Sequence, residues 1–380
     1  MFRVSQFMHE LVAPTAVGPR RDPPGPVVIW NLIRRCNLTC KHCYSISADK
    51  DFAGELSTDE VFGVMKDLKS FRVPVLILSG GEPLLRPDIF DIAIRAKEMG
   101  FYTALSSNGT LIDDRIADRI AEIGFNYVGI SIDGIDSTHD RFRARQGAFA
   151  ESMGGIRRCV ERGVKVGLRF TMTMDNAAEL PQVIDLMESE KVAKFYFSHL
   201  NYAGRGNKNR LDDATMQVTR NSMDHLFDVA WAHAAAGRER EFVTGNNDAD
   251  GPYFLSWVRR NHPDKADHVA GKLRQWGGNA SGINVANIDN LGEVHPDTMW
   301  WNHKLGNVRD RPFSSIWPDT SDALMAGLKA RPRPVEGRCK ACAHLDMCNG
   351  NTRVRAQRVT GNAWAEDPGC YLSDEEIGLA

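Results

Sequence analysis

The sequence predicts an α/β protein built as a partial (β/α)6 TIM barrel, followed by a small cysteine-rich C-terminal domain. Three observations predict this fold. Short apolar segments alternate with longer amphipathic segments from residue 27 to residue 237. The alternation then stops, and the remaining chain carries hairpin and loop signals. All cysteines except Cys159 lie in two groups, one near each end of the chain.

The composition is that of a globular protein and narrows the classes of partner. The chain has 380 residues, of which 42% are hydrophobic and 25% charged, so a disordered or collagen-like protein is excluded. The formal net charge is −2, which gives no overall basic field for nucleic acid or a membrane surface, and we expect neither partner. No apolar run approaches the roughly 20 residues of a membrane helix, and the N-terminus lacks a signal-peptide core. We therefore expect a cytoplasmic protein with reduced thiols.

The barrel elements follow from apolar runs and helix boundaries. We expect strands at 27–32, 75–80, 101–107, 127–133, 165–173 and 194–200. Strands this apolar are typical of a parallel sheet that is covered on both faces. We expect helices at 57–71, 87–99, 112–123, 149–161, 177–189 and 212–236. Ser57 or Thr58 can cap the first helix, and glycines follow several of the others, which is a common helix stop.

Four regions are expected along the chain. Residues 1–26 contain the run PRRDPPGP and should form an irregular lead-in. The barrel should occupy 27–237, and 238–282 should be a linker with a short helix. Residues 283–380 should open with a β-hairpin whose turn lies near 290–292 and continue as a tail rich in Pro, Cys and Arg. Such a tail buries little apolar surface, so we expect it to fold around bound metal.

The first cysteine group is Cys36-x3-Cys40-x2-Cys43, directly after the first strand. Loops at the carboxyl ends of barrel strands are where this architecture places chemistry. Three thiolates can ligate three irons of a 4Fe–4S cluster and leave one iron without a cysteine. A structural zinc site, the alternative, normally has four protein ligands. His42 can in principle supply a fourth ligand, but at this spacing we expect it to pack beside the cluster.

This spacing resembles that of the radical S-adenosylmethionine (radical SAM) superfamily. In that family the open iron chelates the amino and carboxylate groups of S-adenosyl-L-methionine, and an electron from the cluster releases a 5′-deoxyadenosyl radical. The resemblance implies that Cys36, Cys40 and Cys43 hold the catalytic cluster. It also implies the fold of the family, a partial barrel of the radical SAM type.

Residues at later strand ends extend the resemblance. Gly80, Gly81 and Glu82 stand where the family has its methionine-binding motif, and Glu82 would take up the methionine ammonium group. An ordinary strand-to-helix turn is the alternative. The resemblance implies that further strand-end residues contact the ribose, carboxylate or adenine of the cofactor: Ser106, Asn108, Ser131, Asp133, Arg169 and Leu200. A satisfied polar lining, or for Leu200 an ordinary core position, is the alternative.

The second cysteine group is Cys339-x2-Cys342-x5-Cys348, followed by Cys370. It resembles the C-terminal SPASM or twitch extension of radical SAM enzymes. The resemblance implies one auxiliary 4Fe–4S cluster ligated by all four thiolates, and so two clusters per chain. A full SPASM pattern has a further cysteine at the position of Thr352 and others near the hairpin, which this chain lacks. Zinc on the same four ligands is the alternative. We expect isolated Cys159 to be a small buried hydrophobe.

Two features bear on the substrate. The tail from 331 to 358 is rich in arginine, which predicts a site for a multiply anionic substrate. A solvated face, or compensation of thiolate charge, is the alternative. His199 is the histidine best placed to face the barrel mouth. It can be an axial ligand to iron in a substrate, although a lone histidine is more often simply hydrogen-bonded.

Whole-chain similarity goes further, through MFRVSQFMHEL, YFSHLNYAGRGNKNR and CKACAHLDMCNGNTRVRA. These segments resemble the radical SAM proteins of haem d1 biosynthesis. That resemblance implies removal of two propionates from an iron tetrapyrrole, 12,18-didecarboxysirohaem, with ferredoxin or flavodoxin as electron donor. The alternatives are a haem synthase that decarboxylates coprohaem, a SPASM-type peptide or protein modifier, and a non-catalytic metal module or electron carrier. Residues 1–26 leave no room for the recognition domain that peptide modifiers often carry.

Overall fold

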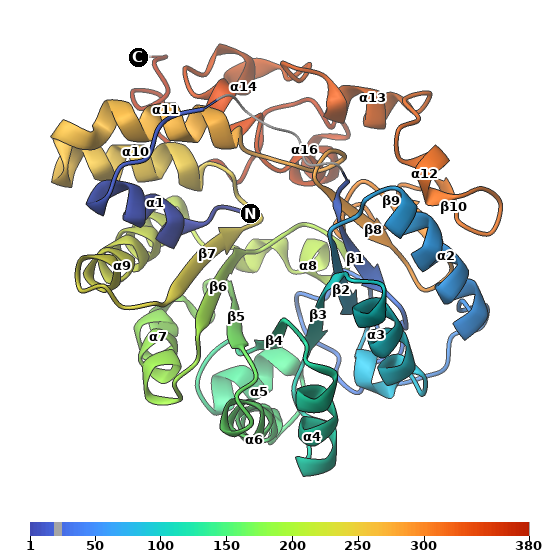
Figure 1. The fold of residues 1–380 in the computed structure, drawn as a ribbon. Helices are drawn as coiled ribbons and strands as arrows, with labels where there is room; N and C mark the ends of the chain where they lie inside the picture. The colour runs from blue at the N-terminus through green and yellow to red at the C-terminus, as the bar shows by residue number, and fades with distance from the viewer. Residues whose placement is uncertain (19–24, 380) are drawn as a thin grey trace.

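The computed structural model describes residues 1–18 and 25–379, and a single sheet organises them. Its strand order is β10-β9-β8-β1-β2-β3-β4-β5-β6-β7. Each neighbouring pair from β1 to β7 is parallel, and these strands form the open barrel wall in Figure 1. The six predicted strands are β1 (Val27–Asn31), β2 (Val75–Ser79), β3 (Tyr102–Ser107), β4 (Tyr127–Ser131), β5 (Val166–Met172) and β6 (Lys194–His199). The predicted α/β partial barrel is confirmed.

The predicted helices cover the outer face of this wall (Figure 1). They are α2 (Thr58–Ser70), α3 (Ile89–Glu98), α4 (Asp114–Ile123), α6 (Ala148–Glu161), α7 (Leu180–Ser189) and α9 (Met216–Ala235). Ser57 caps α2 in a reciprocal capping box with Glu60, and Gly124 ends α4 in the left-handed conformation. Two short helices, α5 (Ser137–Arg143) and α8 (Gly204–Lys208), follow strand ends on the side of the cysteine loop.

The structure contains elements that were not predicted. The strand–helix alternation was expected to stop near 240, but β7 (Glu241–Gly245) adds a seventh parallel strand beside β6. Its apolar run is only Phe242 and Val243, which is too short to predict a strand from the sequence without knowledge of its pairing with β6. Within the expected irregular lead-in, α1 (Val4–Val12) is a helix that packs on α9 and β7. Its buried residues follow helical spacing, a signal the prediction did not use: Val4, Phe7, Met8 and Leu11.

The proline-rich part of the lead-in, residues 19–24, lies outside the described residues. The expected linker 238–282 holds two helices rather than one short helix, α10 (Asp250–Asn261) and α11 (Ala266–Trp276). Four short 3-10 helices complete the first three quarters of the chain: Pro83–Leu85, Ala177–Glu179, Arg210–Asp212 and Pro263–Lys265.

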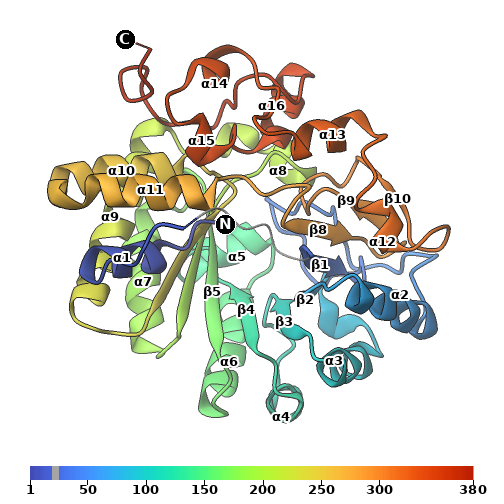
Figure 2. The same cartoon turned by 45° about the horizontal axis from the view of Figure 1, so that its top comes forward.

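The C-terminal region begins with the expected hairpin, β8 (Val285–Ile288) and β9 (Glu293–His295). Strand β8 pairs in parallel with β1, so this hairpin extends the sheet of the barrel. After β10 (Gly306–Asn307) the chain forms only short helices: α12 (Phe313–Ile316), α13 (Ala323–Lys329), α14 (Gly337–Ala341), α15 (Leu345–Cys348) and α16 (Arg353–Thr360). Figure 2 shows this orange-to-red region lying along α10, α11 and the hairpin. The proposed domain limits stay a prediction.

The core is aromatic on the barrel side and includes the isolated cysteine. Phe170, Phe195 and Phe197 are fully buried on adjacent strands β5 and β6. Cys159 is also fully buried, and burial raises the pKa of its thiol to about 11, as expected of a packing residue. Within the described ranges, no helix has both the length and the apolarity needed to cross a membrane.

Candidate functional site

A cavity of about 360 Å³ lies at the carboxyl ends of the barrel strands. Most of the residues predicted to form the site line it together: Cys36, Cys40, Cys43, Gly80, Gly81, Ser106, Asn108, Ser131, Arg169 and Leu200. They come from the ends of six different strands or from the loops after them, which meet at one edge because the strands are parallel. Glu82 and Asp133, also predicted, are not among the lining residues.

The first cysteine loop is held by backbone contacts to the end of β2. The amides of Gly81 and Glu82 donate to the carbonyls of Ile33 and Arg35, at 2.6 and 2.9 Å. A Cβ on Gly80 would overlap the carbonyl of Ile33, and one on Gly81 would overlap those of Arg34 and Arg35. The two glycines are therefore required by the close approach of the cysteine loop, in addition to any approach of a ligand.

The first three thiols lie in a partly apolar environment with two cations nearby. Cys36 and Cys40 are buried with Leu38, and burial raises the pKa of both thiols. Burial also raises the pKa of Cys43, but the charge of Arg205 and hydrogen bonds from Ser45 and Ser47 outweigh it, so the net shift is downward. A positive environment at a buried thiol favours the thiolate, which is the form that ligates iron.

Arg143 is a site residue that the sequence analysis missed. It is the last residue of α5 and lines the cavity, and its Nη1 donates to Cys40 Sγ at 3.5 Å. Its Nη2 donates to the buried carboxylate of Asp133, which also accepts the Thr171 amide at 2.7 Å. Asp133 thus lies behind the cavity wall and orients a guanidinium toward a cluster-loop cysteine. Its direct contact with a cofactor stays a prediction.

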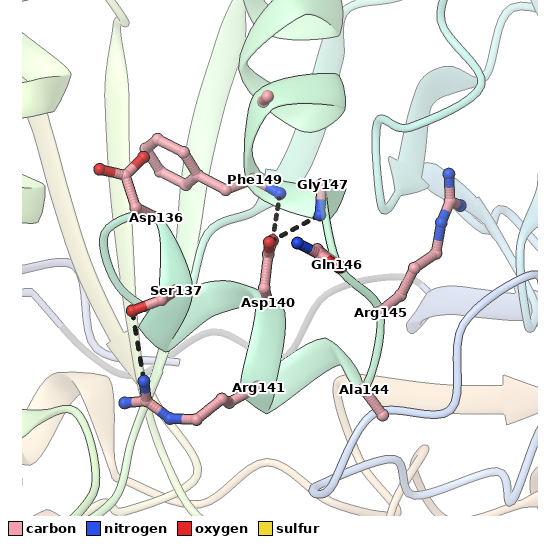
Figure 3. Close-up of a pocket in the computed structure, with 10 residues that line it drawn as sticks. Asp136, Ser137, Asp140, Arg141, Ala144, Arg145, Gln146, Gly147 and Phe149 are labelled. Atoms are coloured by element: carbon pink, nitrogen blue, oxygen red, sulfur yellow. Dashed lines mark hydrogen bonds between the residues drawn. The ribbon is translucent and has the colours of Figure 1, made fainter.

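The segment that carries Arg143 also lines a surface hollow of about 520 Å³, which is shown in Figure 3. Asp140 accepts the amides of Gly147 and Phe149, at 2.6 and 2.8 Å, and so closes the turn between α5 and α6. On the inner side, the amide of Lys41 donates to the carbonyl of Phe142 at 3.0 Å. This turn therefore packs on the cysteine loop and fixes the position of the Arg143 backbone.

Glu82 joins the ends of β2 and β3. Its carboxylate accepts the hydroxyl of Ser107 and the amide of Asn108, both at 2.8 Å. The side chain is fully buried, and burial raises its pKa to about 7. Both carboxylate oxygens thus hold protein donors, so the expected contact with a methionine ammonium group also stays a prediction.

Arg169 supplies a cation at the cavity wall. It lies opposite Ser131 in the β4–β5 register, donates to the Ser106 hydroxyl and stacks over the ring of Tyr196 at 5.3 Å. In the described part of the chain it has no carboxylate partner. A guanidinium placed in this way can pair with a ligand carboxylate.

His42 lies within the cysteine loop, and its expected place beside a bound cluster stays a prediction. Its ring lies 4.7 Å from that of Phe142. Burial, with the charges of Arg143 and Arg205, holds the pKa of His42 well below its usual range, so the ring is neutral. Among residues 1–18 and 25–379, no three His, Cys, Asp or Glu side chains close around one point as ligands of a single ion do.

The far wall of the cavity comes from segments that the sequence analysis did not connect with the site. They follow β7, flank the hairpin and precede α16, and they contribute Asn246, Asp248, Asn279, Ser281, Asp297, Thr298, Met299 and Thr352. Burial raises the pKa of Asp248 and Asp297. These short polar loops carry no motif, so the sequence did not indicate that they line the cavity. The hairpin reaches the cavity because β8 pairs with β1.

The second cysteine group is assembled by α14, α15 and the tail. Burial, together with the nearby thiols of Cys370, Cys342 and Cys339, raises the pKa of Cys348 well above its usual value. Arg338 Nη1 lies 3.4 Å from Cys370 Sγ, and Arg353 Nη2 lies 4.0 Å from Cys339 Sγ. The described structure thus brings the four predicted ligands together and supplies cationic donors to two of them.

Three arginines of the tail are not available for the expected anion-binding patch. Arg333, Arg353 and Arg355 are almost fully buried, and their guanidinium groups bond to protein atoms. The prediction of a substrate patch is wrong for these three residues. Contacts of Arg338 and Arg353 with thiols agree with the alternative, compensation of thiolate charge.

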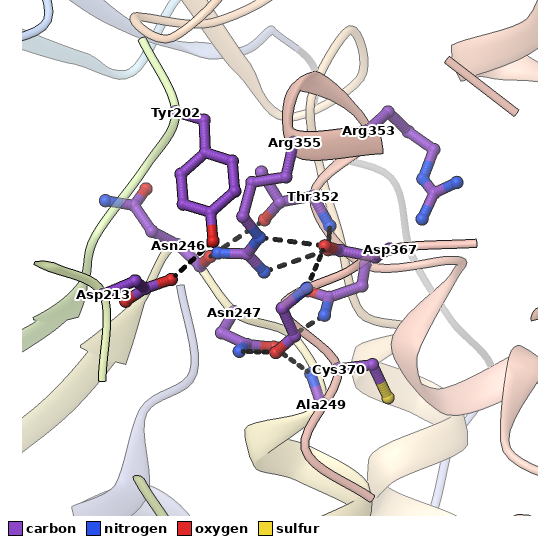
Figure 4. A network of polar contacts seen from close by, with 12 residues as sticks. Tyr202, Asp213, Asn246, Asn247, Ala249, Thr352, Arg353, Arg355, Asp367 and Cys370 are labelled. Atoms are coloured by element: carbon purple, nitrogen blue, oxygen red, sulfur yellow. Dashed lines mark hydrogen bonds and ion pairs between the residues drawn. The ribbon is translucent and has the colours of Figure 1, made fainter. Parts of the chain in front are cut away.

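One of these arginines joins the cavity wall to the second cysteine group (Figure 4). Arg355 forms a two-pronged ion pair with Asp367, both bonds 2.9 Å long, and donates to the carbonyl of Asn246 at 2.6 Å. Asp367 also accepts the amides of Thr352 and Gly369. The loop after β7, the cavity-lining Thr352 and the segment before Cys370 are therefore one hydrogen-bonded unit.

Comparison with known proteins points to one family. Residues 30–187 match the model of the Radical SAM superfamily. The chain is 53% identical to the Pre-heme d1 synthase of Dinoroseobacter shibae, covering 100% of this chain and 94% of the relative. It is 45% identical to the Fe-coproporphyrin III synthase of Methanosarcina barkeri, covering 93% and 89%. The structure of Streptococcus suis SuiB bound to precursor peptide SuiA matches with a TM-score of 0.73 at 16% identity, covering 93% and 77%, which is a likeness of fold.

Proposed function

This chain belongs to the radical SAM superfamily, in the family of the pre-heme d1 synthase, and on that premise we propose that it removes propionate side chains from an iron tetrapyrrole in haem d1 biosynthesis. The observation that carries this proposal is 53% identity over the whole chain. Membership of the superfamily implies a 4Fe–4S cluster and S-adenosyl-L-methionine as cofactors. We take 12,18-didecarboxysirohaem as the substrate and two propionates as the groups removed.

Cys36, Cys40 and Cys43 would hold the first cluster. When bound, the cluster and S-adenosyl-L-methionine supply a 5′-deoxyadenosyl radical that takes a hydrogen atom from the substrate. The residues fit such a cluster because the thiols share one cavity wall, and the charges of Arg143 and Arg205 oppose the effect of burial at Cys40 and Cys43. Arg143 also donates a hydrogen bond to a sulfur, and such bonds tune the reduction potential of iron–sulfur clusters.

Other residues of the chain would bind and orient the sulfonium cofactor. Arg169 is suited to its carboxylate, since it is a cation at the cavity wall. Ser106, Asn108 and Ser131 offer hydroxyl and amide groups, and Leu200 offers an apolar surface for the adenine. Glu82 holds the ends of β2 and β3 together behind them. Because these residues line a cavity at the strand ends, they also limit access of water to the reacting atoms.

Cys339, Cys342, Cys348 and Cys370 would hold an auxiliary 4Fe–4S cluster. Their mutual proximity and the cationic donors at Cys339 and Cys370 support this assignment. An electron donor of the ferredoxin or flavodoxin kind would serve the protein in the cytoplasm. Two clusters predict about eight irons per chain after anaerobic reconstitution, and about four would contradict the auxiliary cluster.

The test of the function is anaerobic turnover of reconstituted protein with S-adenosyl-L-methionine, a reductant and 12,18-didecarboxysirohaem, followed by mass spectrometry. We expect loss of two propionate side chains and formation of 5′-deoxyadenosine. Cys40→Ala should abolish both, because one iron loses its ligand. Cys159→Ala, which removes a buried thiol away from the cavity, should retain both and is the matched control. An unchanged tetrapyrrole with the unaltered protein would overturn the proposal.

A second candidate is favoured by the 45% identity to the Fe-coproporphyrin III synthase. Both candidates act on an iron tetrapyrrole, so the same cavity serves either. The product distinguishes them, since iron coproporphyrin III in the same assay would replace the first function with the second.

A further inference from the structure

Building on the proposed function, we infer that His199 ligates the iron of the tetrapyrrole substrate through Nδ1, and that Asp250 holds the ring in position. His199 is the last residue of β6 and lines the cavity, next to Leu200 and across from the hairpin segments. Iron at the centre of a tetrapyrrole has axial positions, and a histidine nitrogen is a frequent ligand there.

A buried carboxylate fixes the orientation of the ring. His199 Nε2 lies 2.9 Å from Asp250 Oδ1 and 3.2 Å from Oδ2. Asp250 is fully buried, accepts the hydroxyl of Tyr371 at 2.7 Å and also accepts the hydroxyl of Thr244. A carboxylate can only accept, so the imidazole must carry its proton on Nε2.

The proton on Nε2 leaves the lone pair on Nδ1. No hydrogen bond to Nδ1 is found among the described residues, and Nδ1 is not one of the fully enclosed atoms that lack a partner, although His199 is only 4% exposed. The ring is further restrained by Phe197, whose centroid lies 5.0 Å away edge-on, and by Tyr371, stacked at 5.9 Å. A histidine that donates one ring N–H to a carboxylate and offers its other nitrogen is the arrangement proteins use to ligate metals.

The other histidine of the cavity does not meet these conditions. His42 belongs to the first cysteine loop, between Cys40 and Cys43, and its Nε2 lies 3.9 Å from Asp133, a carboxylate already paired with Arg143. His199 lies instead at the junction with the C-terminal tail, because Tyr371 directly follows Cys370. The geometry thus assigns substrate iron to the side of the cavity that faces the second cysteine group.

The test is absorption and electron paramagnetic resonance spectroscopy of full-length, cluster-reconstituted protein titrated anaerobically with 12,18-didecarboxysirohaem. The metal-free form of this tetrapyrrole is the parallel probe. We expect the unaltered protein to give a histidine-ligated iron spectrum. His199→Ala should lose that spectrum and bind the iron form at least about tenfold more weakly, a ratio of the size expected for one lost strong contact. It should bind the metal-free form equally well, and added imidazole should restore the spectrum.

Two further variants sharpen this test. His233→Ala is the matched control, because His233 is also 4% exposed and faces a carboxylate, Glu188 at 3.4 Å, but does not line the cavity. It should keep the ligated spectrum. Asp250→Asn should keep ligation but shift the spectrum, since a neutral acceptor makes the imidazole a weaker donor to iron.

The outcomes distinguish failure of the ligand assignment from failure of the proposed function. An unaltered iron spectrum in His199→Ala would overturn the ligand assignment, and so would equal weakening of the iron and metal-free forms. If the unaltered protein bound neither tetrapyrrole, the proposed function would fall, and the ligand assignment with it. If the unaltered protein bound both forms without a histidine signature, only the ligand assignment would fall.

Discussion

Gly81 shows how one residue constrains the site. It has no space for a side chain, because a Cβ there would overlap the carbonyl oxygens of Arg34 and Arg35 in the cysteine loop. Those oxygens are backbone atoms just before Cys36, so they can move only if the loop moves. The position of the first cysteine group therefore depends on a glycine that belongs to the next strand–loop connection.

We predict that Gly81→Ala displaces the cysteine loop and impairs binding of the first cluster. Iron content after reconstitution should fall by up to about half, since one of two clusters is affected, and formation of 5′-deoxyadenosine should be lost. Gly63→Ala is the matched control, because a Cβ at Gly63 in α2 meets nothing within 4 Å. That change should keep the iron and stabilise the fold by about 0.5–1 kcal/mol through helix propensity. Full iron content in Gly81→Ala would refute the packing argument.

At the scale of elements, the barrel and the C-terminal tail are joined by buried polar contacts as well as by the sheet. Strand β8 adds to β1, while on the other side the Arg355–Asp367 pair ties α16 and the tail to the loop after β7. Both members of this pair are almost fully buried. A buried pair costs desolvation to form, but removal of one member leaves an uncompensated charge.

Arg355→Gln should therefore lower the free energy of unfolding by about 3–5 kcal/mol. The matched control is Arg119→Gln, which breaks an ion pair to Glu122 whose side chains are 45% and 64% exposed. Solvent screens that pair, so its loss should cost less than about 1 kcal/mol. Denaturant unfolding of the two variants in parallel measures the difference. Equal costs would contradict the role of the buried pair as the connection between these elements.

At the scale of the molecule, features encoded in local sequence patterns could be predicted, whereas features that depend on tertiary contacts could not. The six strands and the two cysteine groups are visible in apolar runs and spacing, which are local. Strand β7 was missed because its five residues become a strand only beside β6. Arg143 was missed because its partners, Asp133 and Cys40, reach it only through the fold. The arginines of the tail were misread for the same reason, since sequence gives charge but not burial.

The fold places the first cysteine group in the wall of the cavity at the strand ends, and the central claim is that radical chemistry there acts on a propionate. The most direct measurement is mass spectrometry of 5′-deoxyadenosine formed anaerobically from 12,18-didecarboxysirohaem deuterated on its propionate carbons. The account predicts that 5′-deoxyadenosine carries deuterium from those carbons. Substrate deuterated only on its ring methyl groups should leave it unlabelled. Unlabelled 5′-deoxyadenosine from the propionate-labelled substrate, or label from the methyl groups, would contradict the account.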